Sequence, residues 1–178
     1  MTKRPRLRLG VLLWAAGVLG AVTVTVGVLP QLTAGLPLPA PLWLLMIAGS
    51  AQSAVLIALA VWSGVALAPG VGLRAPAFQA AAVGEPIATP LKPQILPGVV
   101  TGAQGGLFLF ASLRLSPAPI AALQTRFTPP LYARLLYGGI TEEILLRWGL
   151  MTAFTQTFDA IDKSQVIRND GTTVAVRA

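Results

Sequence analysis

Long apolar runs dominate the chain and alternate with short segments that are rich in proline or charge. Three of these runs cover residues 9–29, 41–68 and 95–115, and the one charged residue in them is Arg114. A helix rises about 1.5 Å per residue, so about 20 residues cross the hydrocarbon core of a bilayer. The pattern therefore predicts three transmembrane helices before residue 116.

A fourth apolar run covers residues 130–154, and charged side chains interrupt it near its middle. Pro129 and Pro130 stand where its first turn would form, a position that tolerates the missing N–H group of proline. We expect a fourth transmembrane helix here. The sequence thus predicts an all-α, polytopic helical membrane protein, with about four transmembrane helices forming a single region over residues 1–154.

The connecting segments predict less regular structure. Residues 71–94 hold four prolines and form a loop, in which 75–83 could lie as a short helix along the membrane surface. Past residue 154 the composition turns polar and the chain cannot span. We interpret residues 155–178 as a polar, disordered tail, with a small hairpin around 169–171 as the alternative.

Glycines in the third run predict a helix contact. Gly98, Gly102 and Gly106 repeat every fourth residue, so they share one face of a helix. Small residues at this spacing let two membrane helices approach closely. We expect this face to pack against another helix.

Composition supports a membrane protein and excludes several other classes. Charged residues are 11% of the chain and apolar residues 54%, whereas a soluble domain carries about 25% charged residues. The lipid bilayer is therefore the expected partner. The net charge of +7 does not indicate nucleic-acid binding, because the cations form no stripe with interleaved aromatic residues.

Basic residues at the N-terminus predict the orientation. Four of the first eight residues are cations, and they directly precede the first apolar run: Lys3, Arg4, Arg6 and Arg8. Cytoplasmic ends of membrane helices are enriched in Lys and Arg. We therefore expect a multi-pass protein of the cell membrane with a cytoplasmic N-terminus. A cleaved signal peptide is the alternative, but the apolar run is longer than usual for one.

Three charged residues in the fourth run form the candidate site. Glu143 and Arg147 are four residues apart, so they share a helix face in the favourable order for an ion pair. Glu142 is turned by about 100° from Glu143 and has no obvious partner. An ionised side chain inside a bilayer is costly and marks a functional site by default.

The surroundings of Glu142 favour a reactive carboxylate. At about 100° per residue, Gly138, Glu142 and Gly149 fall within roughly 40° of one another. The carboxylate would then lie beside little side-chain bulk, where a water could approach, and could act as a general base. A structural charge network, with Arg134 as a further partner, or an ion pathway built on Glu142 are the alternatives.

The segment LLYGGITEEILLRWGLMTAF, residues 135–154, resembles the first motif of the CAAX prenyl protease and bacteriocin-processing (CPBP) family of intramembrane peptidases, also called the abortive-infection family. That motif, Glu-Glu-x-x-x-Arg on a transmembrane helix, is matched by Glu142, Glu143 and Arg147. The segment VGLRAP, residues 71–76, also resembles the family's connection before this helix. The resemblance implies intramembrane hydrolysis of a membrane-associated peptide or protein, with Glu142 activating water and Arg147 supporting the glutamates.

The chain departs from the family at its histidines. It contains no histidine and no cysteine, whereas the resemblance implies histidines on two later helices that complete the site or bind zinc or another divalent metal. We therefore predict no cofactor for this chain. We interpret it as a truncated or frameshifted, inactive form of a CPBP peptidase. The alternative is a non-catalytic membrane binding or structural protein whose Glu-Glu…Arg network holds helices together.

Overall fold

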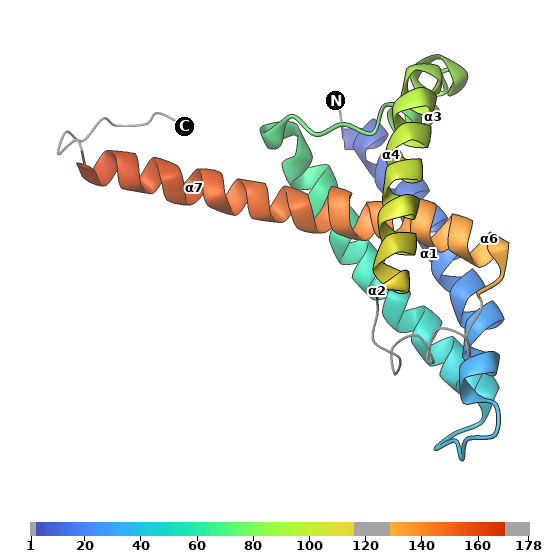
Figure 1. The fold of residues 1–178 in the computed structure, drawn as a ribbon. Coiled ribbons are helices and arrows are strands. Elements are labelled where there is room, and N and C mark those ends of the chain that lie inside the picture. The colour runs from blue at the N-terminus through green and yellow to red at the C-terminus, as the bar shows by residue number, and fades with distance from the viewer. Residues whose placement is uncertain (1–2, 116–128, 170–178) are drawn as a thin grey trace.

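The first two helices form an antiparallel hairpin. In the computed structural model, which describes residues 3–115 and 129–169, helix α1 (Lys3–Thr33) is followed by α2 (Leu42–Leu67). The indole N–H of Trp14 on α1 donates to the carbonyl oxygen of Ala54 on α2 at 3.0 Å. The two helices lie side by side along much of their length (Figure 1).

A short connection leads from α2 to the third long helix. It contains the 3-10 turn η1 (Ala68–Val71) and helix α3 (Pro76–Val83). Pro76 occupies the first turn of α3, and Gly84, with φ of 82°, ends it in the left-handed conformation. The short helix expected over 75–83 is therefore confirmed.

Helix α4 (Ala88–Arg114) begins before the predicted start at residue 95. Pro90 lies in its first turn, where N–H groups have no partner within the helix. Pro93 and Pro97 lie further inside it, and a membrane helix tolerates proline when neighbouring groups satisfy the freed carbonyls. Separately, the hydroxyl of Thr101 donates to the carbonyl of Pro97, four residues earlier, at 2.8 Å.

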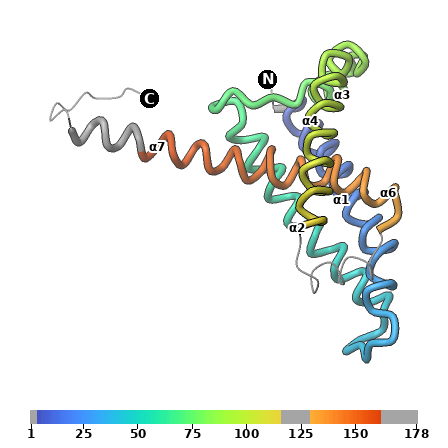
Figure 2. Tube along the Cα trace, in the orientation of Figure 1, coloured from blue at the N-terminus to red at the C-terminus, as the bar shows by residue number. Residues whose placement is uncertain are grey.

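The fourth helix, residues 131–169, is one continuous rod (Figure 1), and Figure 2 traces its first part. It consists of α6 (Leu131–Ala133), η2 (Arg134–Thr141), η3 (Glu143–Met151) and α7 (Thr152–Asn169), of which η2 and η3 are π-helical. The backbone N–H of Glu142 accordingly bonds to the carbonyl of Tyr137, five residues earlier. Its φ of −64° and ψ of −40° keep the rod unbroken at this junction.

The predicted tail is wrong over its described part. Residues 155–169 continue the fourth helix as part of α7, so they are neither disordered nor the first strand of a hairpin. A helix that is already nucleated propagates easily, and no glycine or proline interrupts the sequence until Gly171. Residues 170–178 lie outside the described part of the chain.

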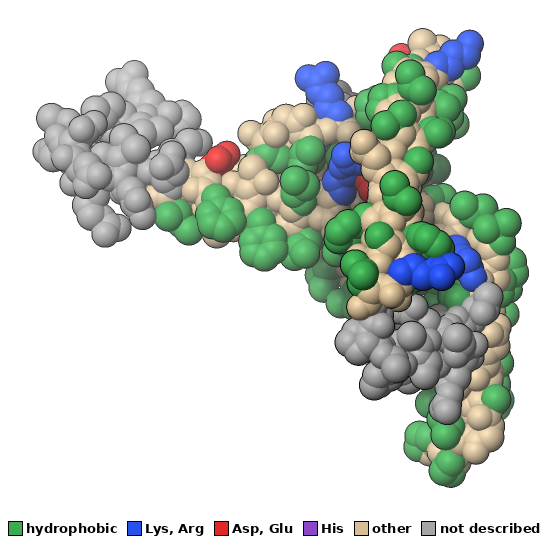
Figure 3. Space-filling view, viewed as in Figure 1, with side chains coloured by type: hydrophobic (Ala, Val, Ile, Leu, Met, Phe, Trp, Pro, Cys, Tyr) green, Lys and Arg blue, Asp and Glu red, His purple; other side chains and the backbone are tan. Residues whose placement is uncertain are grey.

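The fold is that of an all-α membrane protein. Three helices are long and apolar enough to cross a bilayer, over Arg4–Thr33, Leu42–Val71 and Ala88–Arg114, and the described residues contain no β-strand. The fourth predicted span, 130–154, is not among them, because its centre carries three charged side chains. Hydrophobic side chains cover much of the face shown in Figure 3, and charged ones are few.

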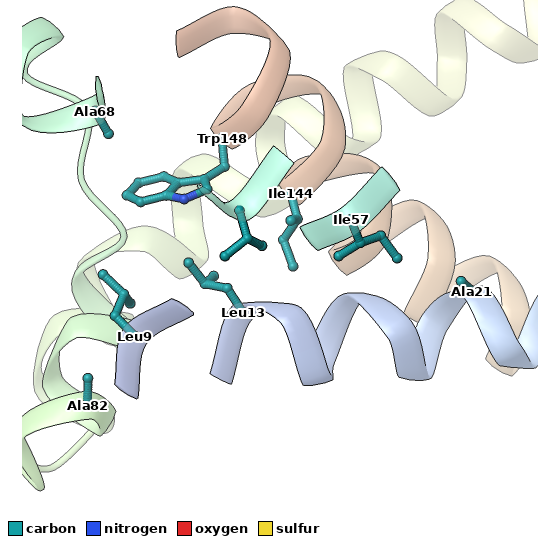
Figure 4. Packing of buried hydrophobic residues seen from close by; sticks show 9 residues of the cluster. Leu9, Leu13, Ala21, Ile57, Ala68, Ala82, Ile144 and Trp148 are labelled. Carbon is teal, nitrogen blue, oxygen red and sulfur yellow. The ribbon is translucent and has the colours of Figure 1, made fainter. Parts of the chain in front are cut away.

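Glycines bring the fourth helix close to the hairpin. A Cβ at Gly20 of α1 would collide with Thr141, one at Gly64 of α2 would collide with the indole of Trp148, and one at Gly149 would lie 2.5 Å from the Cβ of Ala60. Side chains fill the space between these crossings. Figure 4 shows Ile144 and Trp148 pointing from the fourth helix into the buried cluster with Leu13 and Ile57.

The expected glycine contact on the third run is wrong for the described residues. A Cβ added at Gly98, Gly102 or Gly106 would meet nothing within 4 Å, and no residue of α4 is buried. The close contacts are made instead by glycines on the other helices, among them Gly20, Gly64 and Gly149.

Candidate functional site

The ion pair predicted in the fourth helix is present. A guanidinium nitrogen of Arg147 donates to a carboxylate oxygen of Glu143 at 3.0 Å. The two residues are one turn apart on η3, so the helix itself holds the pair. Both side chains are more than half exposed.

Glu142 points away from the packed side of the helix. Its side chain is exposed, and it makes no hydrogen bond or ion pair with any residue that the structure describes. A Cβ at Gly138 would lie 3.8 Å from its carboxylate oxygen, so one side of the carboxylate borders a position without a side chain. The structure thus places the carboxylate of Glu142 beside Gly138, as the helix spacing predicted.

Gly149 does not share that face, and this part of the prediction is wrong. Gly149 is buried against Ala60 of α2, whereas Glu142 is exposed. The prediction assumed about 100° per residue, but the turns between the two positions are π-helical and contain more residues. Over seven residues this difference moves Gly149 to the packed side.

Arg134 is not the further partner considered for the glutamates. Its Nε donates to the carbonyl oxygen of Pro129 at 2.9 Å, five residues earlier. This bond satisfies a backbone acceptor just before the fourth helix begins. Arg134 therefore stabilises the start of the helix, two turns away from Glu142.

A cavity of about 780 Å³ opens beside the ion pair. Glu143, Arg147 and Trp148 line it from the fourth helix, Arg74 from the connection before α3, and Gln94 from the first half of α4. Most of the other lining residues are apolar. A volume of this size with a few polar groups is typical of ligand sites. Glu142 is not a lining residue, so the cavity contacts the paired glutamate and not the free one.

Two side chains that position the site were missed by the sequence reasoning. The buried hydroxyl of Thr141 donates to the carbonyl oxygen of Gly17 on α1 at 2.8 Å, directly before Glu142. Trp148, 8% exposed, follows Arg147 and packs on Gly64. Its buried indole N–H has no partner among the described residues. Glycines stand near both residues in the sequence: Gly138 and Gly139 shortly before Thr141, and Gly149 directly after Trp148.

The described residues do not form a metal site. They contain no cluster of three or more His, Asp, Glu or Cys side chains that could hold an ion. Zinc in a catalytic site takes three protein ligands. Among the described residues that line the cavity, the carboxylate is that of Glu143, and it is paired with Arg147. We derive no metal-dependent step for this chain.

No protein-family model, no curated protein and no solved structure matches this chain. The resemblance to CPBP peptidases rests on the Glu-Glu-x-x-x-Arg motif in the sequence alone.

Proposed function

We propose that the chain is a CPBP-type membrane protein whose fourth helix supplies Glu142 to an intramembrane peptidase site, completed by histidine-bearing helices that these 178 residues do not contain. In that site Glu142 takes a proton from water as the water oxygen attacks the peptide carbonyl, and it returns the proton to the amide nitrogen as the C–N bond breaks. Arg147 pairs with Glu143 beside it. The catalytic set carried by this chain is Glu142, Glu143 and Arg147.

The different environments of the two glutamates support this proposal. Glu143 is neutralised by Arg147 at 3.0 Å, whereas Glu142 has no partner among the described residues. An unpaired carboxylate inside a bilayer costs several kcal/mol or must be neutralised. The carboxylate of Glu142 lies on the exposed face of the fourth helix, where further helices would pack. An unpaired carboxylate at this position is best explained by a functional role.

A non-catalytic structural role is the competing function. In it the Glu-Glu…Arg network ties helices together. The ion pair does not itself join two helices, because both partners belong to the same helix. The fourth helix is instead held to α1 and α2 by glycine contacts, by the Thr141 hydroxyl and by apolar side chains.

The proposal places the protein in the cell membrane, with the fourth helix as a further span and the N-terminus in the cytoplasm. Reporter fusions at Gln31, in the last turns of α1, should report outside, and fusions at Gln79, in α3, should report inside. The motivation is the cationic start of α1. The reverse pattern, or recovery of the chain in a soluble fraction, contradicts this placement.

The purified chain is expected to bind less than one zinc per molecule and to cleave no peptide. Without histidines it lacks both a metal ligand set and groups that stabilise the oxyanion, and loss of one such donor alone costs about 10²–10³ in rate. Metal analysis and a peptide-cleavage assay on the wild-type chain check this. Stoichiometric zinc, or cleavage that Glu142→Ala removes, would show that the lone chain is complete and overturn this part of the proposal.

A further inference from the structure

An apolar groove runs between the start of α1 and the end of α2, away from the glutamates. It encloses about 600 Å³. Gly10, Val11 and Trp14 line it from α1, and Val61, Trp62 and Val65 line it from α2. Trp62 is 72% exposed, so a large aromatic face is available in the groove.

One cation stands at the rim of this groove. Arg6 is the charged residue among those that line it, and its side chain is exposed. Arg4 and Arg8 lie two residues to either side, which turns them by about 200° to the opposite face of the helix. None of the acidic residues with a described side chain lines the groove.

The length of the groove matches one leaflet of a bilayer. From Arg6 to Trp14 the helix rises about 12 Å, and half of a hydrocarbon core is about 15 Å. The groove thus has a cation at the membrane surface and apolar walls below it. It complements a molecule with an anionic head and a long hydrocarbon chain.

We propose that this groove binds one anionic phospholipid, with its phosphate on Arg6 and an acyl chain along Val11, Trp14, Val61 and Val65. The acyl chain gains van der Waals contacts with both helices. The guanidinium binds the phosphate by charge-assisted hydrogen bonds. This site is independent of the proposed peptidase function, and either can fail without the other.

Tryptophan fluorescence tests the proposal, because Trp14 and Trp62 line the groove. The full chain in detergent micelles is titrated with phosphatidylglycerol or phosphatidylcholine carrying brominated acyl chains, which quench nearby indoles. We expect half-maximal quenching at about fivefold lower mole fraction for phosphatidylglycerol, the effect of one cation on an anionic head group. Inorganic phosphate at the same concentration should not compete, since it has no acyl chain.

Matched variants locate the site. Arg6→Gln should remove the preference for phosphatidylglycerol, whereas Arg4→Gln and Arg8→Gln, which delete the same charge on the opposite face, should retain it. The double variant Trp14→Phe/Trp62→Phe should lose the selective quenching. Equal quenching by both lipids, equal effects of Arg4→Gln and Arg6→Gln, or selective quenching that persists in the double variant would each overturn the proposal.

Discussion

Gly64→Ala is expected to destabilise the protein by about 1–3 kcal/mol, the usual cost of overpacking a close contact. The added methyl group would collide with the indole of Trp148 and lie 2.6 Å from that residue's backbone carbonyl. Trp148 cannot move away easily, because it is buried in the cluster that joins the fourth helix to the hairpin. Thermal unfolding in detergent measures the effect as a lowered Tm.

Gly98→Ala is the matched control for this substitution. Gly98 also lies within a long apolar helix, but a Cβ there would meet nothing within 4 Å. Alanine favours a helix over glycine by about 1 kcal/mol, so the Tm should stay the same or rise. Equal losses from both substitutions would mean that the fourth helix does not cross α2 at Gly64.

Arg147→Leu is expected to lower the amount of membrane-inserted protein several-fold. The substitution leaves Glu143 without the partner that lies 3.0 Å away, and removing one member of a charge pair in an apolar environment costs more than the pair contributes. Resistance to alkaline extraction of membranes measures the inserted fraction. The fluorescence of a C-terminal reporter would give the total amount for comparison.

Glu142→Gln is the companion variant, and its inserted yield should hold or rise. Glutamine keeps the shape of the side chain and removes a charge that has no partner among the described residues. A loss equal to that of Arg147→Leu would place Glu142 in the structural charge network. It would favour the non-catalytic function over the proposed one.

The sequence predicted those features that depend on the local composition of the chain. The runs that became α1, α2 and α4 were visible because a long uncharged segment has few other stable states than a membrane helix. The Glu143–Arg147 pair was predictable because four residues along a helix bring two side chains together whatever the surrounding fold.

Features that depend on contacts between distant segments were not predictable. The spacing of Gly98, Gly102 and Gly106 indicated a packed face, yet the close contacts are made by glycines elsewhere, such as Gly20 and Gly64. A glycine shows that a close approach is possible but not which helix makes it. The position of Gly149 was missed for another reason, since the π-helical turns altered a geometry that had been assumed to be regular.

The continuation of the fourth helix past Phe154 shows the limit of composition as a signal. Polar residues exclude a membrane span over 155–169, and the polar composition also predicts disorder there. Polarity excludes burial in lipid, but it does not prevent a helix from extending into water when glycine and proline are absent.

Restored proteolysis by two separate parts is the most direct test of the central claim, that Glu142 belongs to a divided peptidase site. The chain is co-expressed with the histidine-bearing helices that follow the same motif in a CPBP peptidase, and cleavage of that peptidase's own substrate is measured. Packed membrane helices need not be covalently joined, so we expect cleavage with both parts present, none with either part alone, and none with Glu142→Ala. Parts that co-purify without cleaving the substrate, or cleavage that survives Glu142→Ala, would contradict the claim.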